Sequence, residues 1–575
     1  MTQLMARPRP PESGLHAWLA LKARLVFEAA ARVRCSSDVV FALSISAIWL
    51  ALYNVRFWES TAAAMWHPTL GTVAFFASLA ILLLGAQALL LLLMPTRWLM
   101  RVMASVMFIV AASSAYFISA YGALMNKDMM RNVLETDPAE VTGLVNVDFL
   151  AHLLLLGVLP AILLWRVELP RTKWSQQMGQ RLKFVVCAAV VSAVVVFAAS
   201  AHYAVFLREH KPLRYEITPA AATSSVIGLI ASSSHDSKQP LLNAGGAIER
   251  TGRVQKKPLV IFLVVGETAR AVDFQLAGYG RDTNAELKLA SGLTFFSHAT
   301  SCGTATAYSV PCMFSHFGRE RFSIDEARRY TNLLDAFAQA GFDIEWRDNN
   351  AGCKGVCNRV KQISYADRSD AALCPNSYCF DEIMLTDLAA RLDNIDRDTL
   401  IVFHQIGSHG PAYSERYPPA FERFKPACHT NELNKCSPQE IVNAYDNSIA
   451  YTDHVLARQI GMLKAAGDRV DSLLIYLSDH GESLGEQGVY LHGLPYSFAP
   501  RQQKEVPFLI WTSQGFAART RLDSSCLSAR ALQPASHDNL YHTMLGAADM
   551  RNAVYQPELD LISRCRVRGN SGETQ

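Results

Sequence analysis

Long apolar segments interrupt the first third of the chain at regular intervals. They cover residues 39–53, 72–93, 102–121, 149–165 and 184–206. A helix of about 20 predominantly apolar residues is long enough to cross a bilayer. We therefore predict an α-helical membrane domain of five spans over residues 1–206.

Basic residues concentrate in alternate connections between these segments. Six Lys or Arg residues precede the first segment and five follow the fourth, whereas the connection after the first holds only Arg56. By the positive-inside rule the N-terminus is cytoplasmic, and everything after the fifth span lies outside. The first residues lack the features of a removable signal peptide, so we expect the first span to act as the export signal.

The connection between the third and fourth spans, near residues 125–145, is long. In it Met129, Met130, Val133 and Leu134 have the spacing of one apolar helical face. We predict a helix that lies on the outer membrane surface. A simple interfacial cover is the alternative.

The hydrophobic pattern changes after residue 206. Residues 207–257 are rich in Ala, Ser, Gly and Pro, which predicts a linker that skirts the membrane. Beyond it, short and fully apolar runs alternate with helical stretches, a pattern typical of a mostly parallel sheet buried between helices. The runs cover residues 259–265, 342–346, 399–403, 473–477 and 506–511. We predict an α/β domain over residues 258–575.

Composition agrees with this division. Charged residues make up 18% of the chain and apolar residues 50%, which favours a membrane protein. The net charge is +3 and no basic run with interleaved aromatic residues occurs, so nucleic acid is not an expected partner. Ten of the twelve cysteines follow residue 300, as an oxidising compartment would permit.

Polar residues follow the apolar runs of the second domain. Glu267 comes after the first run, Asn350 after the second, His409 after the third, and Asp479 with His480 after the fourth. In open α/β sheets ligands bind beyond the carboxyl ends of the strands. We therefore expect these side chains to converge.

A hydroxyl-rich turn, SCGTATAYSVPCMFS, covers residues 301–315. If Cys302 and Cys312 form a disulfide, the turn is held rigid and presents a hydroxyl at a helix start, where an anion is favoured. Our candidate nucleophile is Thr306, although the chemistry alone also allows Thr304 and Ser309. A structural loop whose threonines cap a helix is the alternative.

Two carboxylates and an imidazole, from Glu267, Asp479 and His480, would complete a four-ligand set with the Thr306 oxygen. Zinc accepts such a set, but manganese and magnesium stay open because sulfur ligands are absent. Zinc beside the threonine would lower the pKa of its hydroxyl. A single Asp-His pair after a strand is more often a cap or a satisfied polar pair.

Further polar residues have two interpretations each. His409 and His492 are candidates for a second metal or for binding phosphate and moving protons, and Lys354 for a positive charge on a phosphate. Ordinary loop residues are the alternative. Among the remaining cysteines, proximity in the sequence favours the pairs Cys353 with Cys357, Cys374 with Cys379, and Cys428 with Cys436, and at longer range Cys526 with Cys565. The sequence leaves the pairing of the last two open, and a CxxxC spacing could instead mark metal or redox use.

Over nearly its whole length the sequence resembles the phosphoethanolamine transferases that modify lipid A in Gram-negative bacteria, which belong to the alkaline phosphatase and sulfatase-like group. The motifs that carry the resemblance are VVGETAR, the hydroxyl-rich turn, RDNN followed by Lys354, HQIGSHGPAY, SDHGESLGE and YLHG. The resemblance implies a zinc-dependent transferase of the bacterial inner membrane with a periplasmic catalytic domain. We expect a monomer.

The resemblance also implies a reaction and roles for residues. Thr306 would attack phosphatidylethanolamine, release diacylglycerol and pass the phosphoethanolamine group to a phosphate of lipid A. The implied zinc ligands are Glu267, Thr306, Asp479 and His480. The implied substrate or second-metal residues are Asn350, Lys354, His409 and His492, and the implied ethanolamine-binding residues are Asn132, Thr136 and Glu140. Ala351 departs from the family, because some relatives carry a serine there.

Several alternatives share these features. The acceptor could be an inner-core sugar of lipopolysaccharide or a periplasmic glucan, and a phosphoglycerol transferase would share the metal site. A sulfatase would need a C/S-x-P-x-R motif, which is missing. A membrane-anchored sensor with a relic site would be expected to have lost one of the four ligand residues, and all four are present. Polymyxin resistance is associated with the family, but the sequence does not determine whether this chain confers it.

Overall fold

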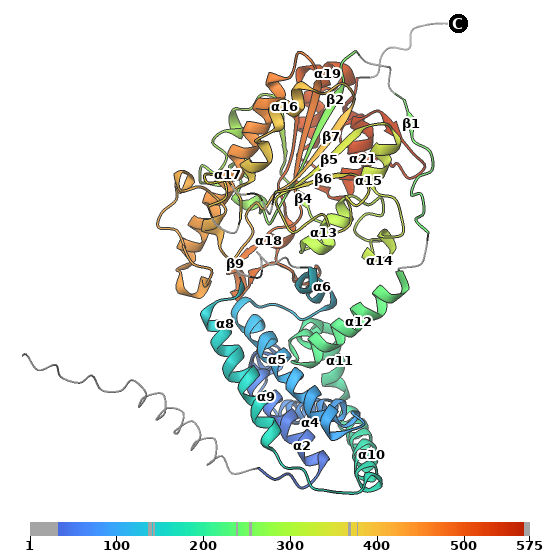
Figure 1. Ribbon diagram of the computed structural model, residues 1–575, viewed down its shortest axis with the longest axis vertical. Coiled ribbons are helices and arrows are strands. Elements are labelled where there is room, and N and C mark those ends of the chain that lie inside the picture. Colours follow the sequence, from blue (N-terminus) through green and yellow to red (C-terminus); the bar gives the residue numbers. More distant parts are fainter. Residues whose placement is uncertain are drawn as a thin grey trace, which may run out of the picture. The chain divides into compact units, whose positions relative to one another are not determined.

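The chain forms two compact units in a computed structural model, shown in Figure 1. The structure describes residues 33–135, 141, 144–236, 240–251, 256–365, 368, 370–375 and 378–567. One unit comprises residues 1–113 and 151–211, and the other comprises residues 114–150 and 212–575. The connection near residues 125–145, which the sequence assigns to the membrane domain, therefore groups with the second unit.

The first unit is helical. Four helical stretches are long and apolar enough to cross a membrane: Leu70–Leu92, Arg97–Tyr121, Val147–Arg166 and Trp174–Ala198. Two further helices, Asp38–Tyr53 and Val55–Met65, form one candidate span that is bent by 66°. Four of the five predicted spans are thus present as candidate spans, and the bent pair would make the fifth if it crosses as one span. The elements are α2 (Asp38–Ile48), η1 (Trp49–Tyr53), α3 (Val55–Met65), α4 (Leu70–Leu92), α5 (Arg97–Tyr121), α8 (Val147–His152), η2 (Leu153–Val158), α9 (Leu159–Leu163), η3 (Leu164–Arg166), α10 (Trp174–Ala198) and α11 (Ser200–Glu209).

The fifth span differs from the prediction of residues 184–206, because α10 begins at Trp174 and ends at Ala198. The sequence places Arg181 in a connection, but this residue lies inside α10 and is buried. Its guanidinium donates to the carbonyl oxygens of Leu92 and Met94 and, at 2.9 Å, to Asp38 Oδ2. This pairing allows a charged residue to be part of the helix.

A seven-stranded sheet forms the centre of the second unit (Figure 1). The strand order is β3-β11-β8-β2-β7-β5-β6; β11 runs antiparallel to both of its neighbours, and the other four neighbouring pairs are parallel. The mostly parallel sheet predicted from the five apolar runs is therefore confirmed. The strands are β2 (Leu259–Gly266), β3 (Leu293–Phe296), β5 (Asp343–Asp348), β6 (Lys361–Ser364), β7 (Thr399–His404), β8 (Asp471–Ser478) and β11 (Phe508–Thr512).

The sequence did not predict β3 and β6, which are the two edges of the sheet. Residues of β3 alternate between buried and half-buried, and β6 is mostly exposed. An edge strand has only one neighbour and needs no continuous apolar run. The signal that identified the central strands is therefore absent at the edges.

Hydrophobic cores lie on both faces of the sheet. Alternate residues of β2 enter different cores: Ile261 and Leu263 belong to one, and Phe262 and Val264 to the other. Helix α17 (Pro438–Ala465) packs in the second core, and α15 (Leu333–Gln339) and α21 (Asp538–Ala547) pack in the first. The remaining elements are α13 (Thr306–Met313), α14 (Ile324–Ala327), α16 (Leu388–Asp393), α18 (Arg501–Lys504), α19 (Gln514–Thr520), α20 (Ser524–Arg530), β1 (Glu249–Arg250), β4 (Ala299–Thr300), β9 (Ser483–Leu484), β10 (Tyr490–Leu491), β12 (Ala535–Ser536) and β13 (Met550–Arg551).

Two helices join the second unit from segments outside the predicted α/β domain. Helix α6 (Lys127–Glu135) packs against α12 (Ala220–Asp236) and α13. The Ser225 hydroxyl on α12 donates to the Met125 carbonyl oxygen at 2.9 Å. The sequence predicts a linker over residues 207–257, but the structure forms a helix over part of it.

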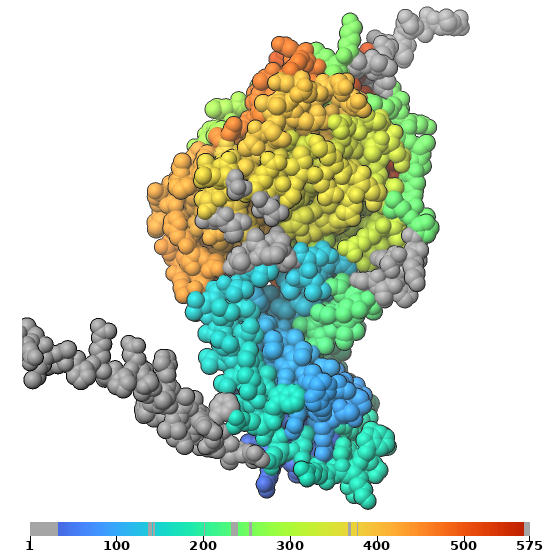
Figure 2. All heavy atoms as spheres, in the orientation of Figure 1, coloured from blue at the N-terminus to red at the C-terminus, as the bar shows by residue number. Residues whose placement is uncertain are grey.

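The predicted helix is present as α6, but its four apolar residues do not share one environment. Met130 is buried, whereas Val133 and Leu134 are 57% and 63% exposed. The reason is that α6 packs against protein on the side of Met130 and Arg131, and Arg131 donates to Asp325 Oδ1 at 3.1 Å. Figure 2 shows α6 at the surface of this unit.

Candidate active site

Four neighbouring parallel strands, in the order β8-β2-β7-β5, end at the same edge of the sheet. Glu267 directly follows β2, and Asp479 and His480 directly follow β8. Both strands are fully buried along their length. The predicted convergence of their end residues is observed.

Glu267, Asp479 and His480 form a compact, fully buried group. One ligand atom from each lies within 4.8 Å of the others, and all three side chains are 0% exposed. His480 Nε2 is 3.4 Å from Glu267 Oε1 and 3.3 Å from Asp479 Oδ2. Two carboxylates and an imidazole thus face one another without water access.

The hydrogen bonds of this group fit a bound cation. Among the described residues, Asp479 Oδ2 has no hydrogen-bond partner although it is buried. His480 Nδ1 lies 2.9 Å from the Gly481 carbonyl oxygen, to which it donates. The Nε2 lone pair therefore faces the two carboxylates, which is the arrangement of a metal-binding histidine. Oxygen and imidazole donors of this kind suit zinc.

Burial disfavours the charged forms of these residues. It raises the pKa of Asp479 to about 6. Burial, followed by the nearby Asp479 charge, raises the pKa of Glu267. Burial also lowers the pKa of His480 to about 4, with His492 adding to the effect. A divalent cation would offset the cost of two buried carboxylates.

Thr306 is the first residue of α13 and points its hydroxyl at this group. Its Oγ1 lies 3.1 Å from Glu267 Oε2, 3.3 Å from Glu267 Oε1 and 3.2 Å from His480 Nε2. The other candidate hydroxyls are occupied elsewhere: Thr304 donates to the Leu494 carbonyl oxygen and Ser309 to the Asp479 carbonyl oxygen. Thr306 alone among the three places its oxygen within reach of the carboxylates.

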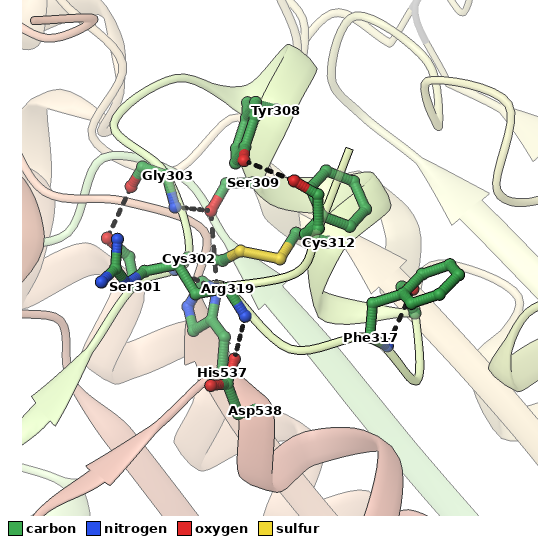
Figure 3. The surroundings of a disulfide bond; sticks show 12 residues. Ser301, Cys302, Gly303, Tyr308, Ser309, Cys312, Phe317, Arg319, His537 and Asp538 are labelled. Atoms are coloured by element: carbon green, nitrogen blue, oxygen red, sulfur yellow. Dashed lines mark hydrogen bonds between the residues drawn. A yellow bond between two sulfur atoms is a disulfide. The ribbon is translucent and has the colours of Figure 1, made fainter. Parts of the chain in front are cut away.

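The turn that carries Thr306 is fastened at its ends (Figure 3). Cys302 and Cys312 form a disulfide, and the Cys302 N–H donates to His537 Nδ1 at 3.1 Å. His537 Nε2 in turn donates to the Ser478 carbonyl oxygen at 2.9 Å. His537 therefore links the turn to the end of β8, and burial lowers its pKa to about 3. The sequence did not identify His537, which lies in no motif.

All five disulfides that the sequence predicts are formed in the structure. Their pairs are Cys302–Cys312, Cys353–Cys357, Cys374–Cys379, Cys428–Cys436 and Cys526–Cys565. The two remaining cysteines, Cys35 and Cys187, are free and belong to the helical unit.

Asn350 lies beside the buried group, and Lys354 follows it in the chain. The Asn350 amide donates to Glu267 Oε2 at 2.8 Å and to the Gln405 carbonyl oxygen at 2.7 Å. Lys354 Nζ donates to the carbonyl oxygens of Ala351, at 2.9 Å, and of Glu135, at 3.1 Å. Because Glu135 ends α6, Lys354 connects that helix to the loop that follows Asn350.

His409 and His492 also reach the site. The His492 ring lies 4.4 Å from the His480 ring and 5.4 Å from the His409 ring, measured between centroids. His492 Nδ1 is 3.3 Å from Glu482 Oε1. Glu482 is fully buried, and burial raises its pKa to about 7. The sequence motif SDHGESLGE contains Glu482, but the prediction gave it no role.

His404, at the end of β7, begins the motif HQIGSHGPAY, but the prediction gave it no role. Its Nδ1 is 3.2 Å from Asp348 Oδ2, and this oxygen also accepts a hydrogen bond from Trp346 Nε1. The attraction of Asp348 raises the pKa of the buried His404 against the effect of burial, and Glu267 and Asp479 add to it. Its position at a strand end was the signal available in the sequence.

The predicted ethanolamine-binding residues are only partly described. Asn132 lies on α6 and is half-buried. Thr136 and Glu140 lie outside the described residues.

Both halves of the chain match known protein families. Residues 83–233 match the family Phosphoethanolamine transferase EptA/EptB, and residues 260–550 match the Sulfatase family. The Salmonella typhimurium protein named phosphoethanolamine transferase EptA is 38% identical over 533 residues, which cover 90% of this chain and 96% of that protein. The Escherichia coli protein named phosphatidylethanolamine transferase Mcr-1 is 37% identical over 513 residues, covering 87% and 94%.

A solved structure is similar over almost the whole chain. It is the integral membrane protein lipooligosaccharide phosphoethanolamine transferase A (EptA) from Neisseria meningitidis. The TM-score is 0.89 at 31% sequence identity, and the match covers 93% of this chain and 99% of that one.

Proposed function

This chain belongs to the EptA/EptB family of phosphoethanolamine transferases, and we propose that Thr306 carries the phosphoethanolamine group during transfer. One observation supports this role above all. The Thr306 oxygen lies within 3.3 Å of Glu267 and His480, while the competing hydroxyls of Thr304 and Ser309 donate to backbone carbonyls.

The donor that we propose is phosphatidylethanolamine and the acceptor a phosphate of lipid A. The name of Mcr-1 contains the donor, and the name of the Neisseria meningitidis relative contains lipooligosaccharide as the modified molecule. Both substrates are membrane lipids. The five candidate spans would hold the chain in the inner membrane, with the N-terminus cytoplasmic and the catalytic unit periplasmic.

Zinc is the cofactor that we propose, held by Glu267, Thr306, Asp479 and His480. The orphaned Asp479 Oδ2 and the orientation of His480 Nε2 support this assignment. When bound, zinc would lower the pKa of the threonine hydroxyl and neutralise phosphate charge.

In the first half of the reaction, Thr306 Oγ1 forms a bond to the phosphorus of phosphatidylethanolamine. The bond from phosphorus to the diacylglycerol oxygen breaks, and diacylglycerol leaves with a proton. The threonine proton passes to a neighbouring base. His409 and His492 are the groups that we propose for moving protons at the site, because both rings lie beside His480 or each other.

In the second half, an oxygen of the lipid A phosphate attacks the phosphothreonine. The new P–O bond forms as the bond to Thr306 Oγ1 breaks, and the hydroxyl regains its proton. Asn350 and Lys354 are positioned to hold the transferred group, since they lie beside Glu267 and at the end of α6. Asn132 on α6, with Thr136 and Glu140, remains our proposal for the ethanolamine site.

The test uses the full-length enzyme expressed in a Gram-negative host, with mass spectrometry of its lipid A. Wild type is expected to add phosphoethanolamine, and Thr306→Ala to add none, because the hydroxyls of Thr304 and Ser309 donate to backbone carbonyl oxygens instead. Thr304→Ala is the matched control and should retain transfer. Transfer by Thr306→Ala would refute the nucleophile. Addition found only on the lipopolysaccharide core would refute lipid A as the acceptor.

Metal content tests the cofactor separately. Purified wild-type protein is expected to contain at least one zinc per chain, and Asp479→Asn should contain less because it loses an anionic ligand. A fully active protein without zinc would contradict the assignment.

A further inference from the structure

Gln503, on helix α18, is a buried residue to which the proposed reaction gives no role. It is 0% exposed. Its amide Nε2 donates to Ser483 Oγ at 2.9 Å and to the Leu491 carbonyl oxygen at 3.0 Å, and its Oε1 accepts from the Leu494 N–H at 3.3 Å. One side chain therefore joins three points along residues 483–494.

Two of these points form the open end of a hairpin. Strands β9 and β10 are antiparallel, and Ser483 pairs with Leu491 across them. Glu482 directly precedes Ser483, His492 directly follows Leu491, and His492 Nδ1 lies 3.3 Å from Glu482 Oε1. Gln503 therefore fixes the hairpin next to the pair formed by Glu482 and His492.

The backbone of Leu491 has an unfavourable conformation. Its φ is 62°, in the left-handed region that bulky L-residues rarely adopt. Such residues persist where surrounding contacts hold them, and they occur often at functional sites. The hydrogen bond from Gln503 to the Leu491 carbonyl oxygen is a contact of this kind. Because His492 is the next residue, the conformation of Leu491 sets the direction of its ring, which lies 4.4 Å from the ring of His480.

The main chain of α18 supports the same region. The Gly481 N–H donates to the Gln503 carbonyl oxygen at 3.0 Å, and the Glu482 N–H donates to the Gln502 carbonyl oxygen at 3.0 Å. A Cβ atom at Gly481 would lie 1.9 Å from the Gln502 oxygen, so the two segments are in direct contact. These main-chain bonds do not need the Gln503 side chain. Loss of that side chain should therefore affect the hairpin more than the segment that directly follows His480.

We propose that Gln503 is a positioning residue for the transfer reaction. It holds Leu491 in the left-handed conformation and thereby aims the His492 ring at the site. This inference rests on the proposed function, in which His492 moves protons. A displacement of about 1 Å can cost a catalytic group much of its effect. Loss of the Gln503 side chain should therefore lower kcat, while the candidate metal ligands at the ends of β2 and β8 keep their places.

The first experiment measures transfer by the purified full-length enzyme in detergent. Gln503→Met has a similar length but lacks the donors and the acceptor of the amide. Its kcat should fall about 10- to 100-fold. Its KM for phosphatidylethanolamine should change by less than about threefold, since the buried side chain does not reach a substrate. Gln502→Met is the matched control, because Gln502 contributes its backbone carbonyl to this network.

A second measurement does not depend on transfer. Diethyl pyrocarbonate modifies accessible histidine rings, and peptide mass spectrometry locates the modified residues. In Gln503→Met, His492 should react several-fold faster than in wild type, because its ring is no longer held. His480 is 0% exposed, and its reaction should stay as in wild type. The metal content should also stay as in wild type.

Variants of Leu491 test the conformation itself. Leu491→Ile keeps the side-chain volume but is β-branched and therefore disfavoured at positive φ, so it should lower kcat as Gln503→Met does. This variant decides the question if Gln503→Met does not fold. Glycine adopts positive φ without strain, so adding Leu491→Gly to Gln503→Met should restore part of kcat. If Gln503 were only structural, the double variant would be worse than Gln503→Met, because Leu491 packs against a hydrophobic core.

Unchanged kcat and unchanged His492 reactivity in Gln503→Met would overturn the proposal. Loss of metal together with faster modification of both His480 and His492 would also overturn it, because Gln503 would then hold the whole site together. Absence of transfer by wild type would refute the proposed function, and the reactivity of His492 would still decide whether Gln503 positions its ring.

Discussion

Buried charges occur in both units, but they are arranged in opposite ways. In the helical unit Asp38 is 1% exposed, and each of its oxygens accepts from one arginine, Arg97 or Arg181. In the α/β unit Glu267 and Asp479 are equally buried, yet they face each other across His480, whose pKa burial lowers to about 4. The first group is neutralised by the protein and the second is not.

This difference separates a structural cluster from a functional one. A buried carboxylate with two cationic partners needs nothing further, and removing one partner leaves an uncompensated charge. Two buried carboxylates beside a neutral imidazole have no such partner in the group, and a cation from outside the chain, as we propose, would compensate their charge. Strongly perturbed groups in a shared site are candidates for function for this reason.

Asp38→Asn should have the largest effect on stability, because it leaves the buried Arg181 and the half-buried Arg97 without their carboxylate. We expect the free energy of unfolding to fall by about 3–5 kcal/mol. Thermal unfolding of the full-length protein in detergent measures this, with transfer normalised to folded protein unchanged. Glu59→Gln is the control, since Glu59 is exposed and its pair with Arg56 should contribute less than about 1 kcal/mol. Equal losses of stability in Asp38→Asn and Glu59→Gln would show that the buried Asp38 cluster does not stabilise the helical unit more than an exposed ion pair does.

Asp479→Asn should change the free energy of unfolding of the metal-free protein in the opposite direction to Asp38→Asn. The asparagine keeps the acceptor that binds the His480 N–H and replaces the orphaned oxygen by an N–H donor, so the repulsion from Glu267 is lost. We expect metal-free protein to gain about 1–3 kcal/mol in stability, while transfer is abolished. Unfolding is compared after chelation for wild type and variant. A destabilised metal-free variant would show that the two carboxylates do not repel.

Glu482→Gln should lower transfer about 10- to 100-fold, since it removes the carboxylate that orients His492. The expected loss is in kcat more than in KM, with thermal stability close to that of wild type. Glu482→Asp, which keeps the charge, should restore part of the activity. Half-buried Glu505, paired with Arg501, is the control position for Gln. If Glu482→Gln were only less stable, with kcat unchanged, Glu482 would be structural.

Substitution of His537 should have the smallest effect, which is a change in how stability depends on pH. Burial lowers its pKa from 6.5 to about 3, so below pH 6.5 the unfolded chain binds a proton that the folded chain does not. This contribution to stability is complete above pH 6.5 and is lost as the pH falls, by at most about 1.4 kcal/mol per pH unit.

His537→Asn should flatten that slope in metal-free protein between pH 6.5 and pH 4.5, even though it lowers stability overall. The measurement is thermal unfolding across this range. Exposed His429→Asn should leave the slope unchanged. An identical slope in wild type and His537→Asn would mean that other groups cause the loss of stability in acid.

Much of the fold was predictable because its signals are local. A strand buried on both faces is a continuous apolar run, and this identified β2, β5, β7, β8 and β11. Residues that end such strands meet at one edge of the sheet, and this brought Glu267 together with Asp479 and His480 before any contact was known. Cysteines close in sequence paired for the same local reason.

Other features depend on contacts between distant residues. Resemblance to a family singled out Thr306 in the sequence, and only the hydrogen bonds of Thr304 and Ser309 show why those hydroxyls are unsuitable. His537 lies more than 200 residues from the turn that it fastens. No spacing rule connects residues so far apart.

The sequence by itself determined which residues can form spans and strands and which can act as ligands. The reason is that hydrophobic periodicity and the ends of strands depend only on residues that are close together in the sequence. The tertiary structure alone decided which charges are paired. Arg181 reads as a loop residue until Asp38 lies opposite it, and Asp479 is a ligand candidate because its Oδ2 has no partner among the described residues. The physical reason is that the cost of a buried charge depends on its neighbours in space, which one sequence does not specify.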